Sequence, residues 1–344
     1  MGGSVRRRAT GRGMISILVW STSVPVSRIV LEAFGLYLGT AITLLAAGLF
    51  LFLLTSRRER GVGWVGRLTR LHLAVCGPLF VGYILLLYGA VGTAVTRPEA
   101  IAAGLANYLW PSMILLFSVL ILRARARADA LTIGVAVSLA GIVLAASVNV
   151  EGVSRLVEAL LPPPLSFGLG LAAAVCWGLY SVIARVFRQS NSSGAVSIFL
   201  LIAGGASLAI AVSGGGLVVP DWGFPHAAIA VAAAAYMALL PNSLAYWFWD
   251  VAIRDGDVPT LGAIANLIPI LSAAIGTLVL GIGVRPELLA GAGLVAVGSA
   301  VSRLSFRRAA ADPATPSAGR SVRRGSAARR IRPGSRDPSD PPSP

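Results

Sequence analysis

Arginine clusters divide this chain into a series of long apolar intervals, and that pattern restricts its fold more than any other feature. A helix needs about 20 apolar residues to cross a bilayer. Only 12% of the residues are charged, about half the roughly 25% of an ordinary soluble domain. The sequence therefore predicts an all-α polytopic membrane protein with ten spans, at 14–31, 35–56, 71–96, 100–122, 130–148, 165–187, 194–213, 226–253, 258–281 and 287–302.

The distribution of arginine predicts the topology. All 29 basic residues are arginine. If the chain crosses ten times from a cytoplasmic N-terminus, 25 of the 29 lie on the cytoplasmic side, as the positive-inside rule requires. We therefore expect both termini in the cytoplasm. The expected parts are a basic N-terminal tail (1–13), a first five-helix repeat (14–148), a periplasmic loop (149–164), a second repeat (165–306) and a disordered basic C-terminal tail (307–344).

The net charge of +15 does not point to nucleic acid. Fourteen arginines and only three acids lie in 1–13 and 303–344, next to predicted spans. Basic residues in that position set topology and contact anionic lipid. We therefore expect membrane lipid as a partner and no nucleic acid.

The two halves of the chain resemble each other. Trp20-Ser-Thr is similar to Trp177-Gly-Leu-Tyr-Ser, and Asn107-Tyr-Leu-Trp-Pro111 is similar to Asn266-Leu-Ile-Pro269. Gly134/Gly141 and Gly291/Gly298 share a seven-residue spacing typical of close helix packing. Five spans per copy is an odd number, so the repeats are expected to be inverted around a central cavity, as in many secondary transporters.

Polar and aromatic side chains gather on the spans that carry prolines. We interpret them as a substrate-binding cavity in which rings stack against an apolar solute and amides bind its polar end. The candidate binding residues are Trp20, Ser21, Tyr83, Asn107, Tyr108, Trp110, Trp177, Tyr180, Asn242, Tyr246 and Asn266, and the candidate helix-break or gating residues are Pro78, Pro111, Pro241 and Pro269.

Other interpretations exist for some of these residues. Core packing is the alternative for Tyr83, Trp110 and Trp177. Interfacial belts are the interpretation for aromatic residues near the span ends, namely Tyr37, Trp64, Trp222, Trp247 and Trp249. Asp250 is a candidate for binding a coupling proton, or for pairing with Arg254 one helical turn away.

The sequence predicts no catalytic residues, metal site or cofactor. Its two histidines, His72 and His226, have no ligand spacing, and Cys76 and Cys176 lie in apolar runs. Without a lysine the chain has no Walker-type phosphate loop, which argues against ATP-driven transport.

The five-plus-five repeat, Trp20-Ser-Thr and Asn107-Tyr-Leu-Trp-Pro111 resemble the drug/metabolite transporter superfamily of the EamA type, in its aromatic amino acid exporter branch. The resemblance implies a multi-pass protein of the bacterial inner membrane. It also implies efflux of amino acids, above all aromatic ones, and related metabolites by alternating access, with a small molecule as the partner.

Three alternatives stay open at this stage. The chain could transport another metabolite or drug class, act as a passive facilitator, or be an integral-membrane enzyme on lipid precursors. The sequence does not give an oligomeric state, and a monomer is plausible.

Overall fold

The computed structural model describes residues 3–94, 103–104, 106–147, 165–187, 194–214, 226–279 and 286–311, and within these ranges it is helical, without strands. The expected loop at 149–164 and the end of the C-terminal tail, 312–344, lie outside the described residues. The helices are α1 (Gly3–Phe34), α2 (Leu36–Arg58), the short η1 (Val65–Arg67), α3 (Arg70–Thr93), α5 (Trp110–Leu120), α6 (Ala128–Ser147), α8 (Leu165–Val186), α9 (Ala195–Ser213), α10 (His226–Leu239), the π-helical η3 (Leu240–Ala245), α11 (Tyr246–Asp255), α12 (Val258–Ala265), α13 (Ile268–Val279) and α14 (Pro286–Ala311).

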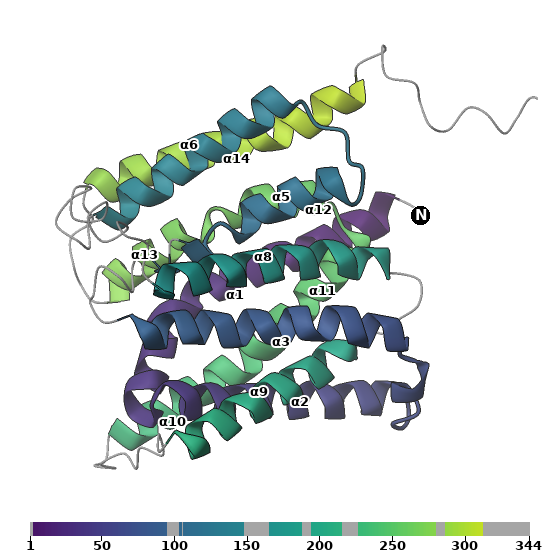
Figure 1. The fold of residues 1–344 in the computed structure, drawn as a ribbon, viewed down its shortest axis with the longest axis vertical. Coiled ribbons are helices and arrows are strands. Elements are labelled where there is room, and N and C mark those ends of the chain that lie inside the picture. Colours follow the sequence, from purple (N-terminus) through teal and green to yellow (C-terminus); the bar gives the residue numbers. More distant parts are fainter. Residues whose placement is uncertain are drawn as a thin grey trace, which may run out of the picture.

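The helices run roughly side by side along one direction (Figure 1). Five helical stretches among the described residues are long and apolar enough to cross a membrane: α2, α3, α8, α9, and α10 to α11 taken together. Shorter apolar helices include α5 and parts of α6 and α14. Figure 1 places α6 and α14 together at one edge of the bundle and α2, α9 and α10 at the other, with α1, α3, α8 and α11 between them.

Two helices are interrupted at positions that match in the two halves. The chain turns at Tyr108 before α5 and at Asn266 before α13. At both turns one amide bonds three residues back instead of four, Leu109 to Ala106 at 3.2 Å and Leu267 to Ile264 at 3.0 Å. Pro111 and Pro269 each occupy the second position of the helix that follows, where a missing N–H costs little.

Glycines bring helices together in antiparallel pairs. A Cβ on Gly134 would lie 2.7 Å from the Gly298 carbonyl, and one on Gly141 would lie 2.6 Å from the Gly291 carbonyl. The same reciprocity relates α2 and α9, where Gly48 packs on Leu201 and Gly204 on Leu45. The predicted role of the seven-residue glycine pairs in close packing is therefore confirmed.

The other two prolines do not break their helices. α3 continues through Pro78, so the expectation of a break there was wrong. Pro241 lies in η3, where the chain widens into a π-helix and continues directly into α11. Residues 3–13, expected as a tail, form the first turns of α1; Ala9 is buried there.

Candidate functional site

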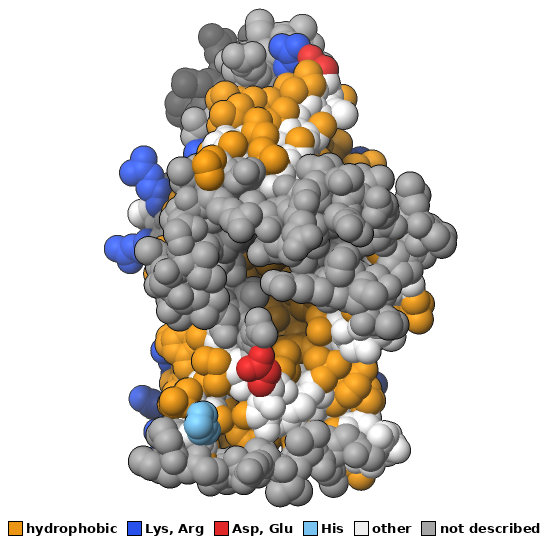
Figure 2. Space-filling model, turned by 90° about the vertical axis from the view of Figure 1, so that its left-hand side faces the viewer, with side chains coloured by type: hydrophobic (Ala, Val, Ile, Leu, Met, Phe, Trp, Pro, Cys, Tyr) orange, Lys and Arg blue, Asp and Glu red, His pale blue; other side chains and the backbone are white. Residues whose placement is uncertain are grey.

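A cavity of about 310 Å³ lies between α1, α3, α8, η3 and the turn before α5. It reaches Leu31 and Val91, close to the C-terminal ends of α1 and α3. That end lies opposite the N-terminus in Figure 1. Figure 2 looks onto it, and hydrophobic side chains predominate among the described residues drawn there. Eight of the eleven predicted binding residues line the cavity: Trp20, Tyr83, Asn107, Tyr108, Trp110, Trp177, Asn242 and Tyr246.

The wall of the cavity is a connected cluster of aromatic rings. Trp20 contacts Trp177 edge to face at 5.8 Å and Tyr246 at 5.2 Å. Trp177 also lies 4.7 Å from Tyr83 and 6.4 Å from Trp110. Such pairs add stability beyond the area they bury, so the rings hold one another in position.

Two rings of this cluster were missed by sequence reasoning. Trp249, interpreted as an interfacial residue, is 0% exposed, stacks on Trp177 and donates from Nε1 to the Ser181 hydroxyl at 3.2 Å. Phe80 is also fully buried and packs against Trp177, Tyr180 and Tyr246. The i, i+4, i+7 spacing of Asn242, Tyr246 and Trp249 was the available signal for Trp249. Trp64, also interpreted as interfacial, is buried against Phe52.

Two amides put polar atoms into this apolar cavity. Asn107 is 8% exposed and Asn242 is 6% exposed. The Oδ1 atom of Asn107 and the Nδ2 atom of Asn242 have no hydrogen-bond partner in the described part of the chain. The hydroxyl of Tyr83 interacts with the side chains of Asn107 and Tyr246. Buried polar groups are almost always satisfied, so these two atoms are candidates for contacts with a bound molecule.

The π-helical turn η3 places Asn242 and Tyr246. Its wider turn leaves backbone carbonyls that helix α1 reaches with side-chain donors. Trp20 Nε1 donates to the Pro241 carbonyl at 3.1 Å, and Ser16 Oγ donates to the Ala245 carbonyl at 2.8 Å. π-Turns within helices are frequent at functional sites, and this one is attached to a ring that lines the cavity.

Three predicted binding residues do not line the cavity. Ser21 is buried and donates to the carbonyl of Ile17 on its own helix. Tyr180 lies behind Trp177, on which it stacks at 5.1 Å. Asn266 is buried at the second helix interruption, where Nδ2 donates to the Ala263 carbonyl at 3.4 Å. The side chain of Pro269 lies outside the described residues.

Asp250 forms a buried ion pair with Arg254 on the next turn of α11. Their side chains are only 3% and 7% exposed. The Tyr180 hydroxyl donates to Asp250 Oδ1 at 3.3 Å. Of the two interpretations of Asp250, the pairing with Arg254 is therefore the one observed, and both charges lie inside the bundle.

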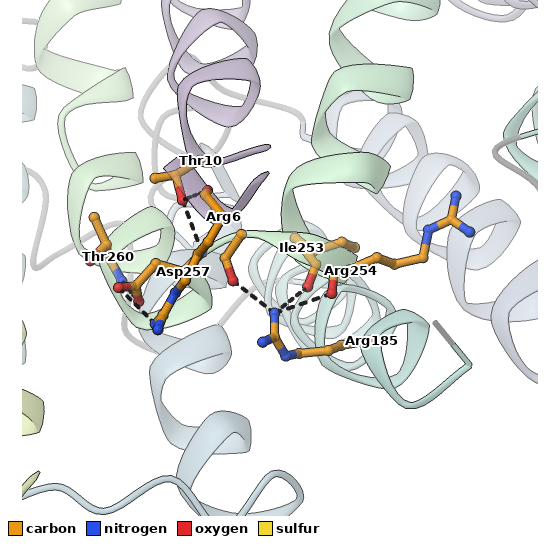
Figure 3. A network of polar contacts seen from close by, with 8 residues as sticks. Arg6, Thr10, Arg185, Ile253, Arg254, Asp257 and Thr260 are labelled. Atoms are coloured by element: carbon orange, nitrogen blue, oxygen red, sulfur yellow. Dashed lines mark hydrogen bonds and ion pairs between the residues drawn. The ribbon is translucent and has the colours of Figure 1, made fainter. Parts of the chain in front are cut away.

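A polar network closes the end of the bundle where α1 begins (Figure 3). Arg6 of α1 pairs with Asp257 at 3.0 Å, and the backbone N–H of Asp257 donates to Thr10 Oγ1 at 3.0 Å. Arg185 of α8 points at the end of α11, where Nη1 contacts the carbonyls of Ile253 at 3.0 Å and Gly256 at 2.9 Å. α1, α8 and α11 therefore meet at this end, which we call the closed end.

The apolar helices, five of them long enough to cross a bilayer, define a membrane protein, and the cavity between them is lined by aromatic rings. The chain belongs to the EamA-like transporter family, whose sequence pattern matches residues 12–147 and again residues 165–304. It is a multi-pass protein of the bacterial inner membrane.

Three relatives are described as aromatic amino acid exporter YddG. The chain is 27% identical to those of Salmonella typhimurium and Escherichia coli and 30% identical to that of Ancylobacter novellus. Each comparison covers 88% of this chain and 99% of the relative. A crystal structure that is 26% identical superposes with a TM-score of 0.73 over 88% of this chain and 98% of its own.

Proposed function

We propose that this protein exports aromatic amino acids and related small metabolites across the inner membrane. The observation that carries the proposal is the cavity, in which tryptophan and tyrosine rings enclose one unpaired amide acceptor and one unpaired amide donor. An aromatic amino acid offers the complement: a flat ring, an ammonium donor and a carboxylate acceptor. A volume of about 310 Å³ lies at the lower end of the roughly 300–1,000 Å³ typical of small-molecule sites, which suits one such molecule.

Within this proposal the eight lining residues form the binding site. Trp20, Tyr83, Tyr108, Trp110, Trp177 and Tyr246 supply its apolar walls, and Asn107 and Asn242 bind the polar end of the substrate. Tyr180 and Asp250 lie behind the wall. The names of the three YddG relatives support the aromatic class.

The proposed architecture is ten spans in two inverted five-helix repeats. The family pattern matches twice, and the helix interruptions at Tyr108 and Asn266 correspond in the two halves. The antiparallel pairs α2 with α9 and α6 with α14 each join equivalent helices of the two repeats, which is the packing that a two-fold axis in the membrane plane generates. We propose repeats at 14–148 and 165–306, joined by a periplasmic loop at 149–164, with residues 3–13 extending the first helix of the first repeat and 307–311 extending the last helix of the second.

Both termini are proposed to lie in the cytoplasm, with transport by alternating access. The arginine distribution puts the start of α1 inside. The cavity then belongs to the periplasmic half, and the network of Arg6, Asp257 and Arg185 closes the cytoplasmic half. This arrangement corresponds to an outward-facing conformation; rocking one repeat against the other would produce the inward-facing one.

Counterflow in proteoliposomes tests the proposal. Purified protein is reconstituted, the vesicles are loaded with unlabelled phenylalanine, and uptake of labelled phenylalanine, tyrosine, tryptophan and leucine is measured. We expect saturable counterflow of the three aromatic amino acids. A carrier exchanges substrates, whereas a channel shows no accelerated exchange, and a pH jump reports whether protons are coupled. Absence of saturable counterflow with all three would overturn the proposal.

A further inference from the structure

Below the cavity, one face of α11 changes from aromatic to charged. Tyr246, Asp250 and Arg254 follow one another at intervals of four residues, so they share a helix face. Tyr246 lines the cavity. By the helical rise, Asp250 lies about 6 Å and Arg254 about 12 Å further toward the closed end. The face of α11 that lines the cavity therefore carries, further along the helix, a buried pair of opposite charges.

The pair is sealed on the cavity side by the aromatic cluster. Tyr180, whose hydroxyl donates to Asp250, stacks on Trp177, which is part of the cavity wall. Trp249, the residue before Asp250, stacks on the same Trp177 ring at 6.4 Å. One layer of rings thus separates the ion pair from the cavity.

Stable helix packing at this position does not require charged side chains. Removing two ions from water carries a desolvation cost, and well-packed apolar residues often fill such a site with equal or greater stability. Asp250 and Arg254 are almost completely buried, and no other Asp, Glu or Arg side chain is buried in the described part of the chain. The two charges match the two charges of an amino acid in type and number.

We propose that Asp250 and Arg254 form a loading site for the zwitterionic end of the substrate on the cytoplasmic side. The carboxylate of Asp250 binds the substrate ammonium, and the guanidinium of Arg254 binds the substrate carboxylate in the two-pronged manner that suits arginine. On binding, Asp250 and Arg254 each give up their contact with the other and contact the substrate instead. The buried region is therefore neutral before and after binding. In the present conformation the pair is closed on itself.

The cover over this side is suited to release. Arg6 and Asp257, which join α1 to the α11–α12 turn, are 60% and 33% exposed, and exposed ion pairs of this kind contribute little stability. Around them, Gly13 lets α1 approach Leu261 and Ala252 closely, and Gly256 lies against Thr10 of α1. An outward movement of the start of α1 that uncovers Asp250 and Arg254 would break this exposed ion pair and the bond from the Asp257 N–H to Thr10.

This inference rests on the proposed function, and a face-specific transport assay tests it. In inside-out membrane vesicles, the initial rate of phenylalanine uptake reports loading at the cytoplasmic face. The variant is the neutral pair Asp250→Asn with Arg254→Gln, which keeps size and hydrogen bonding. We expect KM for phenylalanine to rise about tenfold or more, because charge-assisted contacts to the substrate are replaced by neutral ones. In right-side-out vesicles, where phenylalanine meets the periplasmic face, the KM of the same variant for external phenylalanine should stay unchanged.

The exposed pair Arg127 and Asp129, joined at 2.8 Å, provides the matched control. Its neutral version, Arg127→Gln with Asp129→Asn, should leave KM at both faces unchanged. Size-exclusion elution and thermal unfolding establish that each variant is folded. An unchanged cytoplasmic-face KM in a folded Asp250→Asn/Arg254→Gln variant overturns the loading site.

A second measurement needs no variant. At the cytoplasmic face of the wild-type protein, 2-phenylethylamine lacks the carboxylate and 3-phenylpropionate lacks the ammonium. Both should inhibit phenylalanine uptake at least about tenfold more weakly than unlabelled phenylalanine does. Equal inhibition by either analogue overturns the inference. If the wild-type protein transports no aromatic amino acid at all, the proposed function itself fails, which is a different result from either outcome above.

Discussion

The central column, by which we mean the cavity and the Asp250–Arg254 pair that follows it along α11, has two halves with different chemistry. The half that holds the cavity is built from tryptophan and tyrosine rings and contains amide atoms without partners in the described chain. The other half is closed: Asp250 is bonded to Arg254 and Tyr180, and Arg185 contacts the carbonyls at the end of α11. Under the proposed function, the first region offers its polar atoms to a substrate, whereas the second must exchange its internal partners before it can bind one.

The boundary between the halves is the layer of Trp177, Tyr180 and Trp249. Trp177 lines the cavity and Tyr180 donates to Asp250, so this layer joins the two halves. The variants below test the contrast between the halves, beginning with the boundary.

Removing the ring of Trp177 should have the largest effect. Trp177→Ala takes away contacts with seven other rings. We expect phenylalanine transport to fall at least about thirtyfold, which corresponds to about 2 kcal/mol, and stability to fall by about 3–5 kcal/mol. Counterflow and thermal unfolding measure the two effects. Trp247→Ala, at a half-buried ring that packs on Arg58, is the control and should retain transport; equal losses in both variants would contradict the proposed site.

The inner half should respond to the loss of one charge more than to the loss of both. Arg254→Gln leaves Asp250 buried without its cation and should cost about 3–5 kcal/mol of stability. Adding Asp250→Asn should recover at least half of that loss, because no buried charge is left unpaired. Unfolding in detergent by heat or denaturant measures the difference. If the double variant is as unstable as the single one, the pair is not a self-contained neutral unit.

The outer half should lose affinity rather than stability when an amide is removed. Asn107→Leu and Asn242→Leu each abolish one hydrogen bond to the substrate, worth about 1–2 kcal/mol, so KM should rise about tenfold. Ser21→Ala is the control, because its hydroxyl bonds within its own helix and does not line the cavity. Transport kinetics over a phenylalanine concentration series decide the matter, and an unchanged KM in both asparagine variants would remove the amides from the site.

The smallest effect is expected far from the column, between α6 and α14. A Cβ on Gly298 would lie 2.5 Å from the Gly134 carbonyl, whereas one on Gly293 of the same helix meets nothing within 4 Å. Gly298→Ala should therefore cost about 1–3 kcal/mol through overpacking, and Gly293→Ala should be neutral or slightly stabilising. Thermal unfolding compares them, and KM should not change in either. A shift in KM would mean that the peripheral pair acts on the site.

Much of the site could be predicted because prolines and aromatic residues at mid-span are unusual enough to carry information. The interruptions before Pro111 and Pro269 follow from the chemistry of proline, and Trp110 and Trp177 followed from their depth in the spans. Trp249 was misjudged because its depth was counted from Arg254 and Asp255, charges that were expected to mark the membrane surface. In the structure Arg254 is itself buried, and the arginine-rich start of α1, expected as a tail, is helical and packs at that end.

Asn266 shows a different limit of sequence reasoning. It matches Asn107 in the repeat, yet it does not line the cavity: it is buried, and its Nδ2 donates to the Ala263 carbonyl one turn back on its own segment. A match in sequence does not indicate which way the side chain points. Phe80 could not be predicted from sequence at all, since one phenylalanine in an apolar run carries no positional signal.

The π-helical turn at Leu240–Ala245 sets the angular position of everything that follows it on α11. Each residue turns an α-helix by about 100°, so conversion of this turn to ordinary α-helical register would rotate Tyr246, Asp250 and Arg254 together by about that amount. The cavity wall and the buried charges would leave the column in a single step. Such a conversion would have to break the bonds from the Trp20 indole and the Ser16 hydroxyl to carbonyls of this turn.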